Sequence, residues 1–148
     1  MKPRVLIFED SDIVRATLQG ILDNLGYEVY SFSNPGMCPR YYSSNKDCLD
    51  DDSCSDIIIS DIHMPVENGI DFIENRLKRG CKIKYRALMS ADWNDRDLRI
   101  AEKAGCKVFY KPFDIKELLT WLDTCRLQLN QNTTASYRSA AAANPFQL

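Results

Sequence analysis

The sequence lacks a long hydrophobic stretch. Its longest apolar runs are Val5–Phe8 and Ala140–Ala143, whereas a membrane-spanning helix needs about 20 apolar residues. The first run is also too short for the core of a signal peptide, and the acidic residues Glu9, Asp10 and Asp12 follow it directly. We therefore expect a cytoplasmic protein with no membrane partner.

The sequence also lacks a dominant sign of charge and the residue pairs of a zinc site. Its 19 basic residues face 21 acidic ones, which argues against direct nucleic-acid binding through bulk charge. The six cysteines form no Cys-x-x-Cys pair and there is one histidine, although zinc sites favour closely spaced ligands. Cys38, Cys48 and Cys54 lie in one polar stretch and are interpreted as ordinary thiols that hold neither a metal nor a disulfide.

The sequence does contain an alternation of short apolar runs and helical repeats. Its 148 residues suffice for one domain with its own core. Apolar and β-branched runs predict five strands, at residues 5–8, 28–32, 57–60, 86–90 and 107–110. Apolar residues at helical spacing predict four helices, at residues 14–25, 70–77, 98–104 and 118–129. This alternation indicates an α/β protein with a parallel sheet and helices on both faces.

The segment between the second and third strands departs from this alternation. Residues 33–56 hold Pro35, Pro39, several serines and the acidic run Asp50–Asp52. This composition predicts a loop or a short broken helix where the second helix would lie. We describe it as an irregular insertion at about residues 36–54.

The C-terminal end of the sequence has a different composition from the rest. From about Asn130 onward, asparagine, glutamine, threonine, serine and alanine dominate, and helical periodicity stops. We therefore divide the chain into a domain over residues 1–127 and a polar tail or linker stub over residues 128–148.

Polar residues gather at the predicted strand ends. Glu9 and Asp10 follow the first strand and Asp61 follows the third, while Ser90 ends the fourth strand and Lys111 follows the fifth. The carboxyl ends of parallel strands meet at one edge, where ligands bind in open α/β sheets. Carboxylates that share such a site repel one another by about 4 kcal/mol per pair at 4 Å and an effective dielectric constant of 20. We therefore expect a hard divalent cation such as Mg²⁺ to offset this repulsion.

These residue types together suit phosphoryl transfer. Lys111 supplies a positive charge and Ser90 a hydroxyl group for phosphate oxygens, beside a metal site. Asp61 is the predicted acceptor, because Glu9 and Asp10 are adjacent and suit joint metal binding. A carboxylate can act as the nucleophile toward phosphorus.

The motifs resemble those of the receiver domain of two-component response regulators, such as the small chemotaxis receiver. The resemblance covers about residues 4–127. It rests on four motifs in the right order: Glu9-Asp10, Asp61-x-x-Met64-Pro65-x-x-x-Gly69, Ser90-Ala91 and Lys111-Pro112-Phe113. It implies a flavodoxin-like (βα)5 fold, a doubly wound parallel sheet with strand order 2-1-3-4-5.

The resemblance also implies a role in bacterial phosphorelay signal transduction. Asp61 would receive a phosphoryl group from a phosphohistidine on a sensor histidine kinase or a phosphotransfer protein. The implied Mg²⁺ ligands are Glu9, Asp10, Asp61 and the main-chain carbonyl of His63.

Two further residues and one surface complete the implied switch. Ser90 and Lys111 would bind the new phosphoryl oxygens, and the surface of the fourth helix, fifth strand and fifth helix, about residues 94–125, would change. The expected chemistry is self-phosphorylation and autodephosphorylation rather than enzyme turnover. An unidentified downstream target and a phosphorylation-dependent homodimer are the implied partners.

The chain departs from the family pattern at several positions. The family's switch aromatic normally lies three residues before the lysine, where this chain has Val108. Phe109, the nearest aromatic residue, is therefore the candidate for that role. His63 and Asp92 occupy the two positions that tune dephosphorylation, although His63 also fits a solvated loop residue. Trp93 is expected to be exposed, either as a partner contact or as an aromatic that packs the loop.

Two alternatives belong to other classes. A haloacid-dehalogenase-type phosphatase would also use a strand-end aspartate, a hydroxyl and a lysine around Mg²⁺. It needs an acid two residues after the nucleophile, where this chain has His63, and an acidic pair after the lysine, whereas Glu9-Asp10 comes first. An inert pseudo-receiver should have lost one of the five strand-end groups, and this chain keeps all five.

Overall fold

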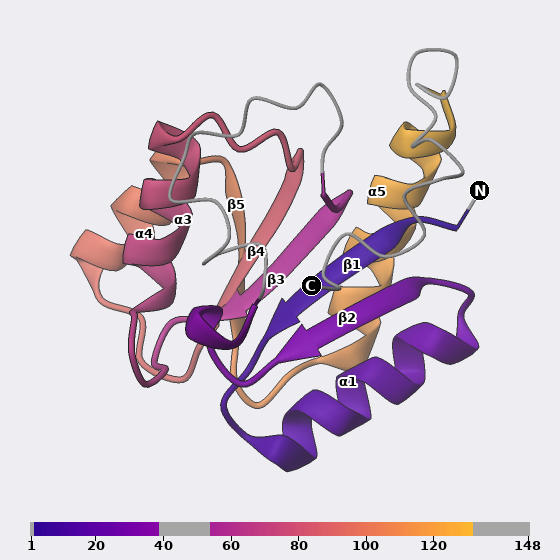
Figure 1. The fold of residues 1–148 in the computed structure, drawn as a ribbon, viewed down its shortest axis with the longest axis horizontal. Coiled ribbons are helices and arrows are strands. Elements are labelled where there is room, and N and C mark those ends of the chain that lie inside the picture. Colours follow the sequence, from indigo (N-terminus) through magenta and orange to yellow (C-terminus); the bar gives the residue numbers. More distant parts are fainter. Residues whose placement is uncertain (1, 39–53, 132–148) are drawn as a thin grey trace.

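A parallel sheet of five strands forms the centre of the molecule, in the order β2-β1-β3-β4-β5 (Figure 1). The computed structural model describes residues 2–38 and 54–131. The strands are β1 (Arg4–Phe8), β2 (Glu28–Phe32), β3 (Ile57–Asp61), β4 (Tyr85–Ser90) and β5 (Cys106–Tyr110). The strand order confirms the expected flavodoxin-like, doubly wound fold.

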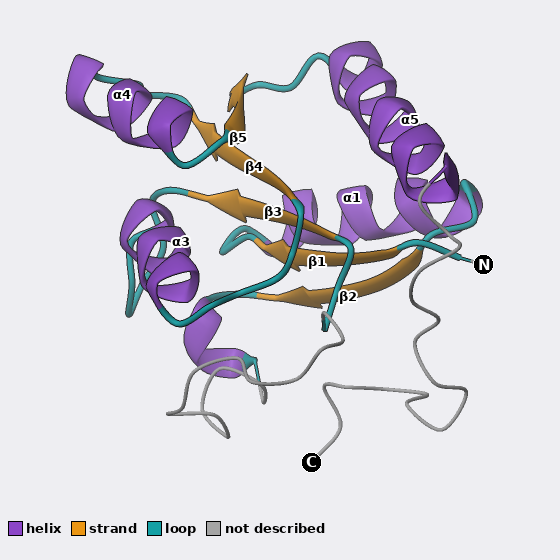
Figure 2. Ribbon diagram, turned by 90° about the horizontal axis from the view of Figure 1, so that it is seen from above, coloured by secondary structure: helices purple, strands orange, loops and turns teal. Residues whose placement is uncertain are grey.

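Helices cover both faces of this sheet. Those in the described part of the chain are α1 (Asp12–Asn24), α3 (Gly69–Lys78), α4 (Asp95–Lys103) and α5 (Ile115–Gln131), with one 3₁₀ turn, η1 (Pro35–Met37). α1 and α5 pack on one face, and α3 and α4 pack on the other, as Figures 1 and 2 show. This layering confirms the arrangement that the alternation of strands and helices predicts.

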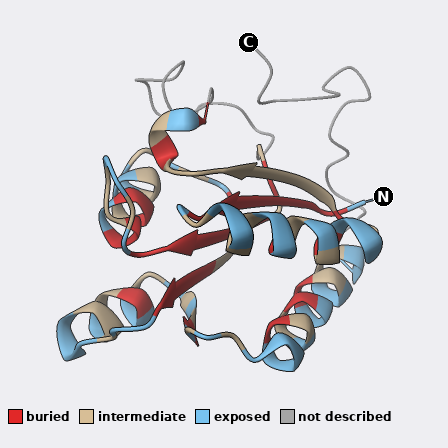
Figure 3. Ribbon diagram, turned by 90° about the horizontal axis from the view of Figure 1, so that it is seen from below, coloured by how far each residue is buried: buried red, intermediate tan, exposed pale blue. Residues whose placement is uncertain are grey.

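The unbroken apolar run of β1 follows from its place between two cores. Val5 and Ile7 belong to the core under α1 and α5, whereas Leu6 and Phe8 belong to the core under α3 and α4. All four side chains are buried, and Figure 3 shows the central strands as the buried layer of the molecule. A parallel strand that is covered on both faces has no solvent side and therefore needs no polar alternation.

Side-chain caps fix the points at which the helices begin. Asn68 Oδ1 accepts a hydrogen bond from the backbone N–H of Ile70 (2.8 Å), and Asn94 Oδ1 accepts one from that of Asp97 (2.8 Å). Ser11 caps α1 in the same way. Each cap satisfies a backbone donor that the first helical turn leaves unpaired. The caps therefore also fix the short loops that follow the strand ends, where the polar residues lie.

The structure describes only part of the predicted insertion at about residues 36–54 and of the predicted tail at residues 128–148. The expected loop or broken helix begins with η1, and most of the predicted insertion, including Cys48, lies outside the described residues. α5 continues through Gln131, so residues 128–131 are helical rather than tail. The rest of the predicted tail also lies outside the described residues. Within residues 2–38 and 54–131, no helix has the length and apolar character that a membrane span requires.

Candidate functional site

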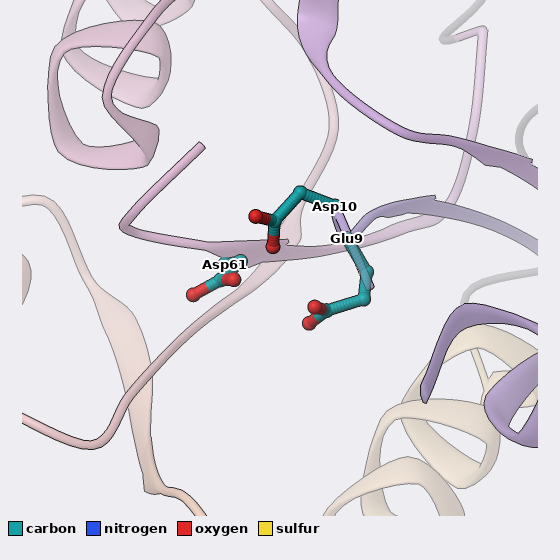
Figure 4. A group of neighbouring side chains, drawn as sticks. All are labelled: Glu9, Asp10 and Asp61. Carbon is teal, nitrogen blue, oxygen red and sulfur yellow. The ribbon is translucent and has the colours of Figure 1, made fainter. Parts of the chain in front are cut away.

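Three carboxylates meet at the carboxyl ends of β1 and β3. Glu9 and Asp10 directly follow β1, and Asp61 is the last residue of β3. Each offers one oxygen atom, and these atoms all lie within 4.8 Å of one another (Figure 4). Glu9 is fully buried and Asp61 is 4% exposed, whereas Asp10 faces solvent. The structure therefore brings together the acidic residues that the strand ends predict.

Lys111 reaches the same cluster from the end of β5. Its Nζ atom lies 2.8 Å from Oε2 of Glu9 and 3.0 Å from Oδ2 of Asp61. The peptide bond between Lys111 and Pro112 is cis. One ammonium group thus contacts both buried carboxylates, and its attraction to them offsets part of their mutual repulsion.

Burial dominates the acid–base properties of these groups. It raises the pKa of the Glu9 and Asp61 carboxyls above their ordinary values, while the hydrogen bonds from Lys111 act in the opposite direction. For Lys111, burial lowers the pKa, but the hydrogen bonds to Glu9 and Asp61 outweigh it and raise the pKa. The lysine therefore stays charged, and the two carboxylates lie in an environment that favours added positive charge.

The loop that carries Glu9 and Asp10 is held by Arg15 of α1. Arg15 Nη1 donates to the main-chain carbonyl of Glu9 (2.8 Å), and Nη2 donates to Oδ1 of Asp12 (2.5 Å). The backbone N–H of Ser11 donates to Oε1 of Glu9 (3.1 Å). Arg15 lies outside the strand-end motifs and was not predicted as a site residue. The available signal was a cation near a helix N-terminus, where the helix dipole disfavours it.

Ser90 lies at the end of the neighbouring strand β4 and is fully buried. Its Oγ atom accepts a hydrogen bond from the backbone N–H of Asp92 (3.0 Å). Its main-chain carbonyl accepts one from the backbone N–H of Lys111 (3.0 Å). All five residues predicted from the strand ends therefore lie along one edge of the sheet, and Ser90 is positioned by the loop that follows it and by the backbone of β5.

The loop after β3 passes close over the acidic cluster. Gly69 closes this loop, because a Cβ atom there would lie 2.0 Å from the main-chain oxygen of Asp61, which no side chain tolerates. Val66 in the same loop has a left-handed backbone with φ of 77°, an outlier for a β-branched residue. The side chain of His63 is exposed, as is that of Asp92 in the loop after β4. Both residues proposed to tune dephosphorylation are thus open to solvent.

The aromatic residues near β5 lie on both faces of the sheet. Phe109 is buried on the α1 and α5 face, and its ring meets Trp121 edge-on at 5.7 Å. Trp93 was expected to be exposed but is half-buried, and it packs the loop as the second interpretation of this residue proposed. Its Nε1 donates to the main-chain carbonyl of Phe109 (3.0 Å). Phe109 therefore has the surroundings of a core residue, and Trp93 is the ring that ties the loop after Ser90 to β5.

The comparison with protein families identifies the chain. Residues 5–123 match the family model of the response regulator receiver domain. The chain belongs to this family. Its acidic cluster, strand-end lysine and strand order agree with the expectations that the sequence motifs raised.

Curated relatives of this receiver domain are longer proteins. It is 29% identical over 129 residues to the DNA-binding transcriptional regulator NtrC of Azospirillum brasilense, covering 87% of this chain and 24% of the relative. It is 28% identical over 134 residues to the autoinducer 1 sensor kinase/phosphatase LuxN of Vibrio campbellii, covering 90% of this chain and 14% of the relative. The chain thus spans about a quarter or less of the length of these proteins.

Solved structures share the fold of this receiver domain. The N-terminal domain of an uncharacterized protein from Wolinella succinogenes superposes with a TM-score of 0.70 at 27% identity, covering 87% of this chain and 98% of that one. The chemotaxis response regulator CheY4 of Vibrio cholerae gives a TM-score of 0.66 at 23% identity, covering 84% and 99%. These matches agree with the strand order observed here.

Proposed function

We propose that this receiver domain is a phosphoacceptor switch in which Asp61 accepts a phosphoryl group from a phosphohistidine. The donor would be a sensor histidine kinase or a phosphotransfer protein. The observation that carries the proposal is the 3.0 Å contact between Lys111 Nζ and Asp61 Oδ2 in a site that holds two further carboxylates. Such a site holds a nucleophile beside groups that offset phosphoryl charge.

The chemical step needs few groups. A carboxylate oxygen of Asp61 attacks phosphorus and forms a P–O bond, while the P–N bond breaks and its electron pair returns to the donor imidazole. The Lys111 ammonium and the Ser90 hydroxyl then face the phosphoryl oxygens, which carry the negative charge. The placement of Ser90 and Lys111 at the carboxyl ends of the adjacent strands β4 and β5 supports these roles.

The donor set of the site fits Mg²⁺. Three carboxylates face one ammonium group, which leaves two negative charges for a divalent cation to neutralise when all are ionised, and Mg²⁺ prefers oxygen ligands. Glu9, Asp10, Asp61 and the main-chain carbonyl of His63 would hold it, where it would neutralise charge on the phosphoryl oxygens. Burial that raises the pKa of Glu9 and Asp61 supports the same assignment, because a cation relieves the cost of ionising them.

Signal reset and output complete the proposal. The exposed side chains of His63 and Asp92 flank the site, so they would set how readily water reaches the acyl phosphate. The altered surface would be α4, β5 and α5, which would bind a downstream target or a second copy of the chain. Hydrolysis would return the domain to its resting state.

Intact mass spectrometry tests the proposal. The domain is incubated with acetyl phosphate and Mg²⁺, and we expect the mass of one added phosphoryl group on the wild type and none on Asp61→Asn. Asp71→Asn, at an exposed carboxylate in the first turn of α3, serves as the matched control and should be modified like the wild type. An unchanged mass shift in Asp61→Asn would reject the assignment.

This experiment and a phosphate-release assay separate the alternative functions. A wild type that takes up no phosphoryl group would favour an inert interaction module, although all five groups of the site are present. Steady release of phosphate from an ester substrate would favour a phosphatase. The family match argues against the phosphatase, since that class belongs to a different family.

A further inference from the structure

Trp93 fastens the loop after β4 to the edge strand β5. Its indole Nε1 donates to the main-chain carbonyl of Phe109 (3.0 Å). Its ring lies 6.4 Å from that of Tyr110, with the two planes tilted by 60°. The remainder of the side chain packs against the core under α3 and α4. The loop is thus held at the sheet edge by one directed hydrogen bond and by ring contact.

This loop is a short connection between the site and α4. Four residues separate Ser90 from Asp95, the first residue of α4. The backbone N–H of Asp92 donates to Ser90 Oγ (3.0 Å), and the next residue is Trp93. Asn94, which follows, caps α4. The Ser90 hydroxyl is therefore joined by one hydrogen bond to the residue before Trp93, and Trp93 lies two residues before the start of α4.

Strand β5 has no aromatic side chain three residues before Lys111, the position of the switch aromatic in receiver domains. Val108 stands there, and Phe109 turns to the opposite face of the sheet, where it packs against Trp121. Tyr110 pairs with Ser90 in the strand register and is 57% exposed. The aromatic contact between loop and strand is therefore supplied by Trp93 from the loop and by Tyr110 from the strand.

We propose that Trp93 acts as a latch, a side chain whose hydrogen bond to β5 breaks when Asp61 is phosphorylated. Breaking this bond transmits the change at Asp61 to the surface formed by α4 and β5. The bond from Nε1 to the Phe109 carbonyl holds the loop in its unphosphorylated position. When the Ser90 hydroxyl turns to donate to a phosphoryl oxygen, Asp92 and Trp93 move with it and the latch opens. The opening shifts the first turn of α4 and separates the ring of Trp93 from that of Tyr110. This inference rests on the proposed function, since it requires a phosphoryl group at Asp61.

Replacing Trp93 by phenylalanine tests the latch. Trp93→Phe keeps a ring against Tyr110 but removes the donor to the Phe109 carbonyl. We expect it to bind beryllofluoride, in the presence of Mg²⁺, about fivefold more tightly than the wild type, since one hydrogen bond of ordinary net strength shifts an equilibrium by about that factor. The matched control is Trp121→Phe, which alters the other tryptophan beside Phe109, on the far face of the sheet, and should leave the affinity unchanged.

Fluorescence gives a second, independent readout. The chain has two tryptophans, so Trp121→Phe leaves Trp93 as the sole tryptophan emitter. Beryllofluoride with Mg²⁺ should move its emission to longer wavelength as the indole leaves the carbonyl and meets water. This measurement does not depend on the stability of Trp93→Phe.

The outcomes distinguish the latch from the proposed function. Unchanged Trp93 emission at saturating beryllofluoride, with the ligand seen bound by fluorine NMR, would overturn the latch while the phosphoacceptor function stands. Equal affinities of Trp93→Phe and wild type would also overturn it. A wild type that is neither phosphorylated at Asp61 nor able to bind beryllofluoride would overturn both.

Discussion

Replacing Asp10 by asparagine should make the fold more stable while it removes a metal ligand. Asp10 shares the cluster with Glu9 and Asp61, with ligand oxygens within 4.8 Å of one another. At that separation and an effective dielectric constant of about 20, each pair of carboxylates repels by about 3.5 kcal/mol. Asp10 faces solvent, which screens much of this repulsion, so we expect a net gain of about 1–2 kcal/mol in the free energy of unfolding.

Urea unfolding with chelator and with Mg²⁺ measures both effects. Without Mg²⁺, Asp10→Asn should unfold at higher urea concentration than the wild type. With Mg²⁺ at about 100 times its dissociation constant, the wild type should gain about 2.7 kcal/mol through binding to the folded state, and the variant should gain much less. Asp23→Asn, at an exposed carboxylate in the last turn of α1, is the matched control and should change stability by no more than about 0.5 kcal/mol.

Two results would refute this reasoning. A variant that is less stable than the wild type in chelator would mean that Asp10 does not repel its neighbours. A variant that keeps the full stabilisation by Mg²⁺ would mean that Asp10 is not a ligand. Higher stability of the variant in chelator, together with weaker stabilisation by Mg²⁺, would show that Asp10 lowers the stability of the metal-free fold and contributes to metal binding.

Three further predictions concern residues around the site and the core. Arg15→Leu frees the carbonyl of Glu9 and should weaken Mg²⁺ binding about tenfold in a titration, while Arg15→Lys should restore part of it; equal affinities of all three proteins would contradict this. Val66→Gly should raise the free energy of unfolding by about 1 kcal/mol, since Val66 is 74% exposed with φ of 77°; a loss of stability in urea would contradict it. Burial raises the pKa of the Cys125 thiol to about 12 from an ordinary 9.0, so the folded state keeps its proton longer and the wild type should lose stability between pH 9 and 12. Tyr27, Tyr85 and Cys106 also have raised pKa values and contribute to the same loss, so Cys125→Ala should lose less stability than the wild type over this range, and parallel curves for the two proteins would refute the prediction.

The site could be predicted because the topology of a parallel sheet leaves little freedom at its carboxyl edge. Lys111 is separated in sequence by 50 positions from Asp61 and by 102 from Glu9, yet its Nζ contacts both. Apolar runs located the strands, and alternation with helices required right-handed crossovers. The carboxyl ends of the strands then had to lie at one edge of the sheet. The polar residues at those ends could therefore be predicted to form one cluster.

Other features were missed because they depend on contacts with the main chain. Arg15 donates to the main-chain carbonyl of Glu9, and Trp93 donates to that of Phe109. Because every residue has a main-chain carbonyl, the amino-acid sequence does not indicate which one a side chain will bind. The left-handed backbone of Val66 was equally hidden, since valine is typical of strands. The face of Phe109 depends on where β5 begins, because adjacent residues of a strand point to opposite sides.

The most direct test of the central claim is to locate the acyl phosphate. After incubation with acetyl phosphate and Mg²⁺, the modified domain is digested and its peptides are sequenced by mass spectrometry. Our account predicts the phosphoryl group on Asp61. A phosphoryl group on Glu9, Asp10 or any other residue, with Asp61 unmodified, would contradict it.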